Sequence, residues 1–356
     1  MTLLSALPES LSRTWPPFVL VAGLLLIGVA AADDRLFEAI GSRISRANTS
    51  ELNVFSAMMA LVAVVTVVVN LDTSVVFLTP ILLHVARRRQ VSEVGYLYGA
   101  VFMSNSASLL LPGSNLTNLL VLASRHSRGA SFAGAMITPW VVAVVVTWAV
   151  IAWWRRHDWR HGQASTDAAA VLRIDVGVLG VVAALGLMLA LSNPALAVFV
   201  VGVLVSAAHI LRHRFSTRQA LRALSPLTLA GLFCLAVALG TLARVWHGPA
   251  QLMAHAGAWG SAALGAGLSN VVNNLPAAVV LSAHPPAHPY ALLLGLDLGP
   301  NLTVIGALSA VLWWRVARGE GARPSAATFS RVGLVVVPLS LGLCLTALSL
   351  VTPGSF

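Results

Sequence analysis

Two carboxylates stand alone inside long apolar segments of this chain. They are Asp72, within residues 70–74, and Asp297, within residues 297–303. A charged side chain at the centre of a bilayer costs between about 2.5 and more than 10 kcal/mol, so intramembrane carboxylates are rare and usually functional. A carboxylate at that depth can bind a proton or a cation, and both acids lie beside residues that interrupt a helix. The pattern therefore predicts ion-coupled transport.

Polar residues gather at four such interruptions. The four breaks span residues 70–74, 104–118, 269–276 and 297–306. Gly and Pro interrupt the hydrogen-bond ladder of a helix, which frees backbone carbonyls for a cation. The N–H groups that open the next half-helix present a positive dipole end to an anion. Breaks of this kind that meet at the midplane predict one site reachable from either side of the membrane in turn.

The composition excludes a soluble enzyme or a nucleic-acid-binding protein. The chain is 58% hydrophobic and 10% charged, with a mean hydropathy of +0.85, whereas soluble domains carry about 25% charge. Its net charge of +10 comes from arginines that cluster between apolar segments, as topology signals do. We expect an all-α, multi-pass protein of the cytoplasmic (inner) membrane, surrounded by lipid, without nucleic-acid partners and without a cleaved signal peptide.

Segment lengths predict about eight full spans and two re-entrant hairpins. The spans are residues 16–32, 94–123, 132–154, 174–191, 195–211, 226–245, 290–314 and 332–350, of which 94–123 and 290–314 are broken helices. Residues 52–86 and 259–283 are interrupted near their middles, which leaves arms that are marginal or short for a full crossing. We therefore interpret each of these two segments as a helical hairpin that enters and leaves on one side.

Arginine placement fixes the predicted orientation. When the first hairpin enters from the cytoplasm, the cytoplasmic side holds all of the 22 basic residues except Arg13, Arg125, Arg128 and Arg244. The two hairpins then open on opposite faces, which indicates inverted repeats. These are residues 16–154 and 174–350, joined by a cytoplasmic linker at 155–173, with both termini extracytoplasmic. The first repeat has two helices fewer before its hairpin than the second.

The four breaks resemble a known family. Residues 70–81, 106–118, 273–276 and 297–306 are similar, in order, to the hairpin and broken-helix motifs of arsenite/antimonite efflux permeases. These permeases belong to the ion transporter superfamily, together with citrate and sodium/dicarboxylate carriers. The resemblance covers residues 16–350. It implies a homodimerising scaffold, a mobile transport domain that holds both hairpins, elevator-like alternating access and, for an arsenite pump, a soluble ATPase partner.

The resemblance also implies a set of site residues. Carried over position by position, it assigns Asn70, Asp72, Asn115, Asn118, Asn273, Asn274, Asp297 and Thr303 to the site. Thr73, Asn105, Ser114 and Asn301, from the same breaks, complete the predicted substrate- and ion-binding set. A sodium ion would use Asn70, Asp72 and Asn115, and we expect no other metal. Two positions depart from the family pattern: Asn105 stands where an acid is expected, and Asn301 where a base is expected.

The sequence thus predicts a secondary active transporter for a small inorganic or carboxylate anion, or an oxyacid, coupled to a H⁺ or Na⁺ gradient without an organic cofactor. Arsenite/antimonite efflux is the first choice, and a citrate or dicarboxylate symporter is the alternative. An ion channel is the rival from another class. No catalytic constellation is evident, since no His lies near Asp72 or Asp297 in the sequence. Cys234 and Cys344 are too far apart in sequence to suggest a metal site, and His209 is expected at the membrane interface.

Overall fold

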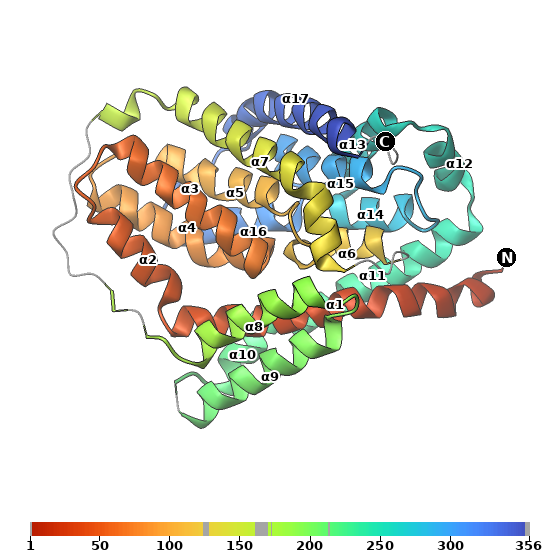
Figure 1. The fold of residues 1–356 in the computed structure, drawn as a ribbon, viewed down its shortest axis with the longest axis horizontal. Helices are drawn as coiled ribbons and strands as arrows, with labels where there is room; N and C mark the ends of the chain where they lie inside the picture. Colours follow the sequence, from red (N-terminus) through yellow and green to blue (C-terminus); the bar gives the residue numbers. More distant parts are fainter. Residues whose placement is uncertain (1, 124–127, 161–169, 172, 213, 353–356) are drawn as a thin grey trace.

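The computed structural model describes residues 2–123, 128–160, 170–171, 173–212 and 214–352. In this part of the chain all regular elements are helices, as predicted, and several of them meet at the predicted breaks (Figure 1). Most of the predicted linker at 155–173 lies outside the described residues. Two groups of helices can be distinguished by their packing, and we call them the α1 bundle and the hairpin core.

The α1 bundle is built around the first helix. α1 packs against α8, α9, α10 and α11, which follow one another much later in the chain (Figure 1). The helices of the bundle are α1 (Leu3–Asp33), α8 (Val176–Ala190), α9 (Ala195–Leu211), α10 (Thr217–Leu224) and α11 (Pro226–Val245). α1 begins well before the predicted residue 16, because Thr2 and Ser5 form a capping box that stabilises an earlier first turn.

Glycines allow α1 and α9 to touch backbone to backbone. A Cβ on Gly23 would lie 2.7 Å from the Cα of Phe199, and a Cβ on Gly202 would lie 2.6 Å from the carbonyl oxygen of Gly23. Helices in lipid gain no hydrophobic stabilisation from packing together. Small residues at a crossing let the backbones approach closely and so increase van der Waals contact. The α1 bundle is therefore a closely packed unit.

The first half of the hairpin core contains the first interrupted segment. Its elements are α2 (Leu36–Ser45), α3 (Glu51–Val68), α4 (Leu71–Arg88), α5 (Glu93–Ala107), η1 (Pro112–Ser114), α6 (Leu116–Leu122), α7 (Gly129–Trp154) and η2 (Asp158–Arg160). Nε of Arg89, just after α4, donates to Oε2 of Glu51, at the start of α3, over 2.7 Å. This contact brings the two ends of the segment together, so α3 and α4 form a hairpin. Tyr96 on α5 also donates to Glu51.

The second half repeats this order. Its elements are α12 (Gly248–His255), α13 (Ala258–Val272), α14 (Asn274–Leu281), α15 (Pro289–Leu298), η3 (Gly299–Leu302), α16 (Leu308–Gly319) and α17 (Ala326–Val351). α13 and α14 meet at Asn273, and α15 and α16 are separated by η3 and a short turn at residues 303–307. The two halves interlock, because α17 packs on α7, α16 on α4, and both α14 and α15 on α6.

The lengths of the helices agree with the predicted crossings. α1, α7, α17 and the continuous segment formed by α10 and α11 are long and apolar enough to span a membrane, and α8 and α9 are shorter apolar helices. With the interrupted pairs α5–α6 and α15–α16 they make the eight predicted crossings. α3 is also long and apolar enough, but α4 returns beside it. The protein is thus a multi-pass, all-helical membrane protein.

Candidate functional site

Four helices that begin at breaks open into one cavity of about 350 Å³. α4 and α14 begin at the tips of the first and second hairpins. α6 and α16 are the second halves of the first and second broken helices. The opposite wall comes from α1, α10 and α11 of the α1 bundle. The cavity therefore lies between the two helix groups, and both repeats contribute to it. Its core wall consists of residues 71–73, 76–77, 115–117, 273–275, 307–309, 312 and 315.

The two hairpin tips share one local design. Asn70 is the N-cap of α4 and accepts a hydrogen bond from the backbone N–H of Thr73 over 2.8 Å. Asn273 is the N-cap of α14 and has a φ of 81° and a ψ of 151°, a strained conformation that residues other than Gly rarely adopt. Its side chain accepts from the N–H of Leu275 and donates to the carbonyl of Ile305 over 2.9 Å. Because the caps correspond, Asp72 is matched by Leu275 in the second repeat.

Asp297 is the deeply buried acid of the site. It is 1% exposed, and its Oδ1 accepts from Nδ2 of Asn115 over 2.9 Å and from the hydroxyl of Thr117 over 2.8 Å. Its Oδ2 has no hydrogen-bond partner within the described structure, and neither has Oδ1 of the fully buried Asn118. A buried oxygen without a partner is costly, so each of these atoms can still accept a hydrogen bond or bind a cation, and the carboxylate oxygen of Asp297 can also bind a proton.

Asp72 has a different environment. It is half-buried, lies in the first turn of α4 and lines the cavity. Among the described residues it has neither an ion pair nor a hydrogen bond, and the hydroxyl of its neighbour Thr73 is buried without a partner. α1 approaches this tip closely, since a Cβ on Gly28 would lie 2.5 Å from Cγ2 of Thr73. The tip therefore abuts the α1 bundle directly.

Asn105 and Asn301, the two neutral departures from the family pattern, bind each other. Nδ2 of Asn105 donates to Oδ1 of Asn301 over 2.7 Å, and the hydroxyl of Ser309 donates to Oδ1 of Asn105 over 3.0 Å. Both amides are buried, and neither lines the cavity. The bridge joins the end of α5 to η3, so the two positions at which the sequence departs from the expected pattern lie within one contact.

The structure places the predicted site residues in distinct positions. Those that line the cavity are Asp72, Thr73, Asn115, Asn273 and Asn274. Those that lie behind it are Asn70, Asn105, Asn118, Asp297 and Asn301. Two more stabilise the breaks: Ser114 donates to the carbonyl of Val67 over 3.0 Å, and Thr303 donates to Oδ1 of Asn270 over 2.8 Å. Asn270 also donates to the carbonyl of Gly299, so it links the second hairpin to the second broken helix.

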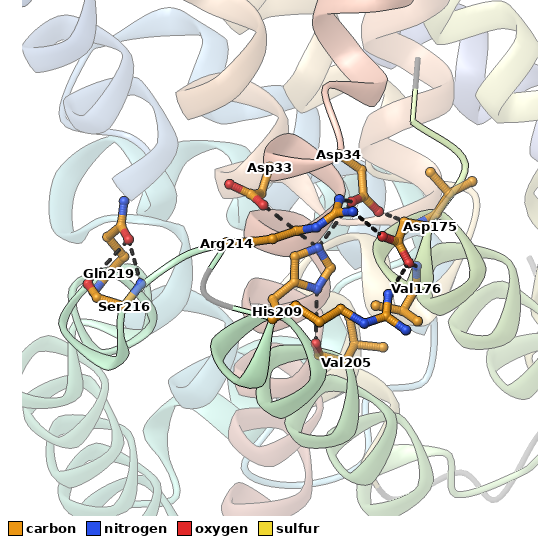
Figure 2. A network of polar contacts seen from close by, with 11 residues as sticks. Asp33, Asp34, Asp175, Val176, Val205, His209, Arg214, Ser216 and Gln219 are labelled. Atoms are coloured by element: carbon orange, nitrogen blue, oxygen red, sulfur yellow. Dashed lines mark hydrogen bonds and ion pairs between the residues drawn. The ribbon is translucent and has the colours of Figure 1, made fainter. Parts of the chain in front are cut away.

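A second charged cluster, absent from the predicted set, lies in the α1 bundle. Asp34 and His209 are both fully buried, and Nε2 of His209 is 3.1 Å from Oδ1 of Asp34 (Figure 2). Nδ1 of His209 faces the carbonyl of Val205 at 3.1 Å, which can only accept. Both ring nitrogens of His209 are thus in contact with an oxygen atom of the bundle. Asp34 holds His209 inside the bundle in the last turn of α9, and its place at the depth of the membrane interface stays a prediction.

Arginines complete this cluster. Arg214 lies between Asp34, at 3.5 Å, and Asp175, at 2.8 Å, and Arg212 is 2.6 Å from Oδ1 of Asp175. Oδ2 of Asp34 accepts from the backbone N–H of Val178. Asp33, Asp34 and His209 are close enough to share a metal ion, but Oδ1 of Asp34 already contacts Arg214 and His209. The arrangement is an ion-pair network that ties α1, α8 and α9 together.

Comparisons with known proteins agree with this architecture. A family model described as citrate transporter, CitMHS, matches residues 4–297. The arsenical pump membrane protein of Escherichia coli strain K12 is 26% identical over 381 residues, which cover 97% of this chain and 88% of that protein. The uncharacterized transporter Rv2684 of Mycobacterium tuberculosis is 27% identical over 372 residues, which cover 92% of this chain and 84% of that protein.

A solved structure has the same fold. The chain of the Alcanivorax borkumensis YdaH transporter matches with a TM-score of 0.61 and covers 98% of this chain and 87% of its own length. The identity is 15%, so this likeness concerns the fold alone.

Proposed function

Because the chain belongs to the citrate transporter family, and is a secondary transporter, we propose that it moves a small anion or oxyacid by alternating access, coupled to a H⁺ or Na⁺ gradient. The observation that carries the proposal is the shared cavity at which α4, α14 and α16 begin, together with Asn115 at the start of α6. Breaks from both repeats meet there, as they do at the midplane sites of transporters with inverted repeats.

Helix starts give the cavity its preference for an anion. The first N–H groups of a helix have no intrahelical partner and carry a partial positive charge. Asn70 caps α4 through Oδ1 and leaves the backbone N–H groups of Leu71 and Asp72 without a partner among the described hydrogen bonds, and α16 begins without a side-chain cap. The second tip offers no such group, because Asn274 donates to the carbonyl of Gly306, Leu275 donates to Asn273, and Pro276 has no N–H. The substrate would bind through its oxygen atoms between the first hairpin tip and the start of α16.

The two carboxylates would do the coupling. Asp297 lies behind the cavity and touches it through Asn115 and Thr117, which also line the cavity. A proton or Na⁺ bound at its free Oδ2 would satisfy that oxygen and change the hydrogen bonds offered by Asn115. Asp72 would face the substrate directly, with Asn70 and Asn115 as the remaining ligands for a sodium ion. Binding of a proton or Na⁺ to Asp297 would in this way change the affinity of the cavity for an anion.

Arsenite or antimonite efflux is our first choice of substrate, because arsenical pump membrane proteins are similar over 97% of this chain. A citrate or dicarboxylate symporter is the second candidate, and the family model favours it. Neither cysteine lines the cavity, so any arsenite binding there would use oxygen ligands rather than thiols.

Flux measurements in proteoliposomes would test these functions. We expect saturable uptake and counterflow of arsenite, antimonite, citrate or succinate that responds to an imposed H⁺ or Na⁺ gradient. Counterflow separates the transporter from the channel alternative, since a channel does not exchange one substrate for another. Absence of flux for the whole panel under both gradients would contradict the proposal.

The membrane, orientation and partners remain part of the proposal. We place the protein in the inner membrane with both termini extracytoplasmic, as the arginine distribution predicts. Cysteines introduced at the exposed positions Ala287 and Glu320 should react with a membrane-impermeant maleimide from the outside and from the cytoplasm, respectively. The opposite pattern would invert the topology. Cross-linking would test a homodimer, and co-purification would test a soluble ATPase partner of an arsenite pump.

A further inference from the structure

We propose that Arg222 and Arg315 form an anion-receiving site at the mouth of the substrate cavity, and that its ligand is a carboxylate or oxyanion that carries a formal negative charge. This inference rests on the proposed function and sharpens it. It requires a charged substrate, so it favours the citrate or dicarboxylate candidate over arsenite, which is the uncharged arsenious acid at neutral pH.

The two arginines line the cavity from opposite sides. Arg222 belongs to α10, in the α1 bundle, and Arg315 belongs to α16, in the hairpin core. Both are exposed, and neither guanidinium group has a hydrogen-bond or ion-pair partner among the described residues. A guanidinium group presents several N–H donors in a plane that matches carboxylates and oxyanions. The cavity thus has two unused anion-binding groups at its rim.

The charge balance of the cavity supports the same ligand. Among the residues that line it, the charged groups are Asp72, Arg222 and Arg315. Their sum is positive even when Asp72 is ionised, and it becomes more positive when Asp72 binds a proton. A cleft lined by one sign of charge raises the local concentration of oppositely charged ligands. An anion bound between the arginines would also link the two helix groups across the cavity.

The simpler explanation for Arg222 and Arg315 is a role in topology, and neighbouring arginines provide the control. Arginines at the ends of spans serve as topology signals and contact lipid headgroups, which needs no substrate. Arg218 lies on α10 one turn before Arg222, and Arg318 lies on α16 one turn after Arg315. Both are exposed, and neither lines the cavity. A general role in topology therefore predicts equal effects at all four positions, whereas the proposed site predicts effects at two.

A chemical probe can measure the potential of the cavity without any transport. Thr228 lines the cavity and is exposed, so Thr228→Cys would report on it. The protein would carry Cys234→Ser, while Cys344 is fully buried and can stay. In nanodiscs made of phosphatidylcholine, the rates of modification by a sulfonate-bearing and an ammonium-bearing methanethiosulfonate reagent would be compared.

We expect Arg222→Gln and Arg315→Gln each to lower the ratio of the anionic to the cationic rate about 3- to 10-fold. Arg218→Gln and Arg318→Gln should leave this ratio within about twofold of that of the parent protein. Equal losses in all four variants, or no loss in any, would overturn the proposal. A dependence on these arginines that appears only after phosphatidylglycerol is added would assign them to lipid headgroups and would overturn it as well.

Transport then tests the substrate itself. With substrate offered at the face where Arg315 lies, Arg222→Gln and Arg315→Gln should raise KM about 5- to 10-fold with little change in kcat. Lysine at either position should restore part of the affinity, which separates charge from folding. Unchanged KM values would overturn the inference while leaving the proposed function standing. Absence of flux in the parent protein would overturn the proposed function, and the modification rates would still decide the fate of the arginine site.

Discussion

Asp34 and Asp297 are both buried carboxylates, yet their surroundings differ in one decisive respect. Asp34 uses both oxygens: Oδ1 meets His209 and Arg214, and Oδ2 accepts from the N–H of Val178. Asp297 uses only Oδ1, and its Oδ2 is left without a partner in the described structure. Its partners at Oδ1 are neutral side chains, whereas those of Asp34 include two basic residues.

Asp34 therefore stabilises the fold, whereas Asp297 has one oxygen that can still bind a proton or a cation. A fully paired buried charge resists any change in protonation, because such a change would leave its partners unpaired. A buried acid with a free oxygen and neutral neighbours loses less on binding a proton or a cation. The α1 bundle thus contains a fixed network, and the hairpin core contains an acid suited to a reversible role.

The largest effect is expected from Asp34→Asn. Removal of one charge from a buried pair leaves its partners unpaired and costs about 3–5 kcal/mol. We expect a clear fall in thermal stability in detergent, with transport per folded molecule retained. Asp33→Asn is the matched control, since Asp33 is partly exposed and lies 3.9 Å from His209. If Asp33→Asn were as destabilising as Asp34→Asn, the buried contacts of Asp34 would not be the cause of the loss.

Asp297→Asn should have the next largest effect, but on coupling rather than stability. The amide cannot take up a proton or neutralise a cation, so gradient-driven accumulation should fall about 100-fold, near the upper end of typical coupling energies. Counterflow, which needs no gradient, should persist. Thermal unfolding should show a smaller loss than for Asp34→Asn. Undiminished accumulation would show that Asp297 is not the coupling group.

A smaller change is expected from Asp72→Asn. Asp72 is half-buried at the cavity wall and has no described partner, so its removal breaks no network. We expect about a 10-fold loss in the apparent affinity for the coupling ion and no loss in thermal stability. Asp72→Glu, which keeps the charge, is the control. An Asp72→Asn variant with the normal ion dependence would confine coupling to Asp297.

Gly28→Ala tests the contact between the two helix groups. The added Cβ would lie 2.5 Å from Cγ2 of Thr73, at the tip of the first hairpin. Overpacking of this kind costs about 1–3 kcal/mol, and we expect the transport rate to fall about 5-fold. A Cβ on Gly186, in α8, would meet nothing within 4 Å, so Gly186→Ala is the control. Equal rates in both variants would show that the tip does not depend on this close contact.

The smallest effect concerns Asp175, at the edge of the fixed network. The backbone N–H of Val176 and the neighbouring Arg212 and Arg214 hold the pKa of Asp175 below its ordinary value of 3.8. Its contribution to stability is therefore complete above pH 3.8 and is lost as the pH falls through the lowered value. Asp175→Asn should be slightly less stable than the parent at pH 7, with the difference shrinking at pH 3. Thermal unfolding at both pH values would check this, and a pH-independent difference would contradict it.

The breaks could be predicted from sequence because their determinants are local. Asn70, Asn273 and Pro300 act on the backbone within a few residues, so the hairpin tips and broken helices were identifiable one by one. The partners of Asp34 and Glu51 could not be found in this way. His209 lies 175 residues after Asp34, and Arg89 lies 38 residues after Glu51, so only the packed fold brings them together. The Asn105–Asn301 contact, 196 residues apart, was equally hidden.

That amide bridge has a consequence for the electrical properties of the transport cycle. Moving one elementary charge across a membrane potential of 100 mV changes the free energy by about 2.3 kcal/mol. Asn105 and Asn301 carry no charge, and the Glu51–Arg89 pair at the base of the first hairpin is neutral as a whole. Among the described residues that line the cavity or lie just behind it in the core, this leaves Asp72, Asp297 and Arg315 as the formal charges. The voltage dependence of transport would then report on whether Asp72 and Asp297 return across the membrane with or without a bound proton or cation.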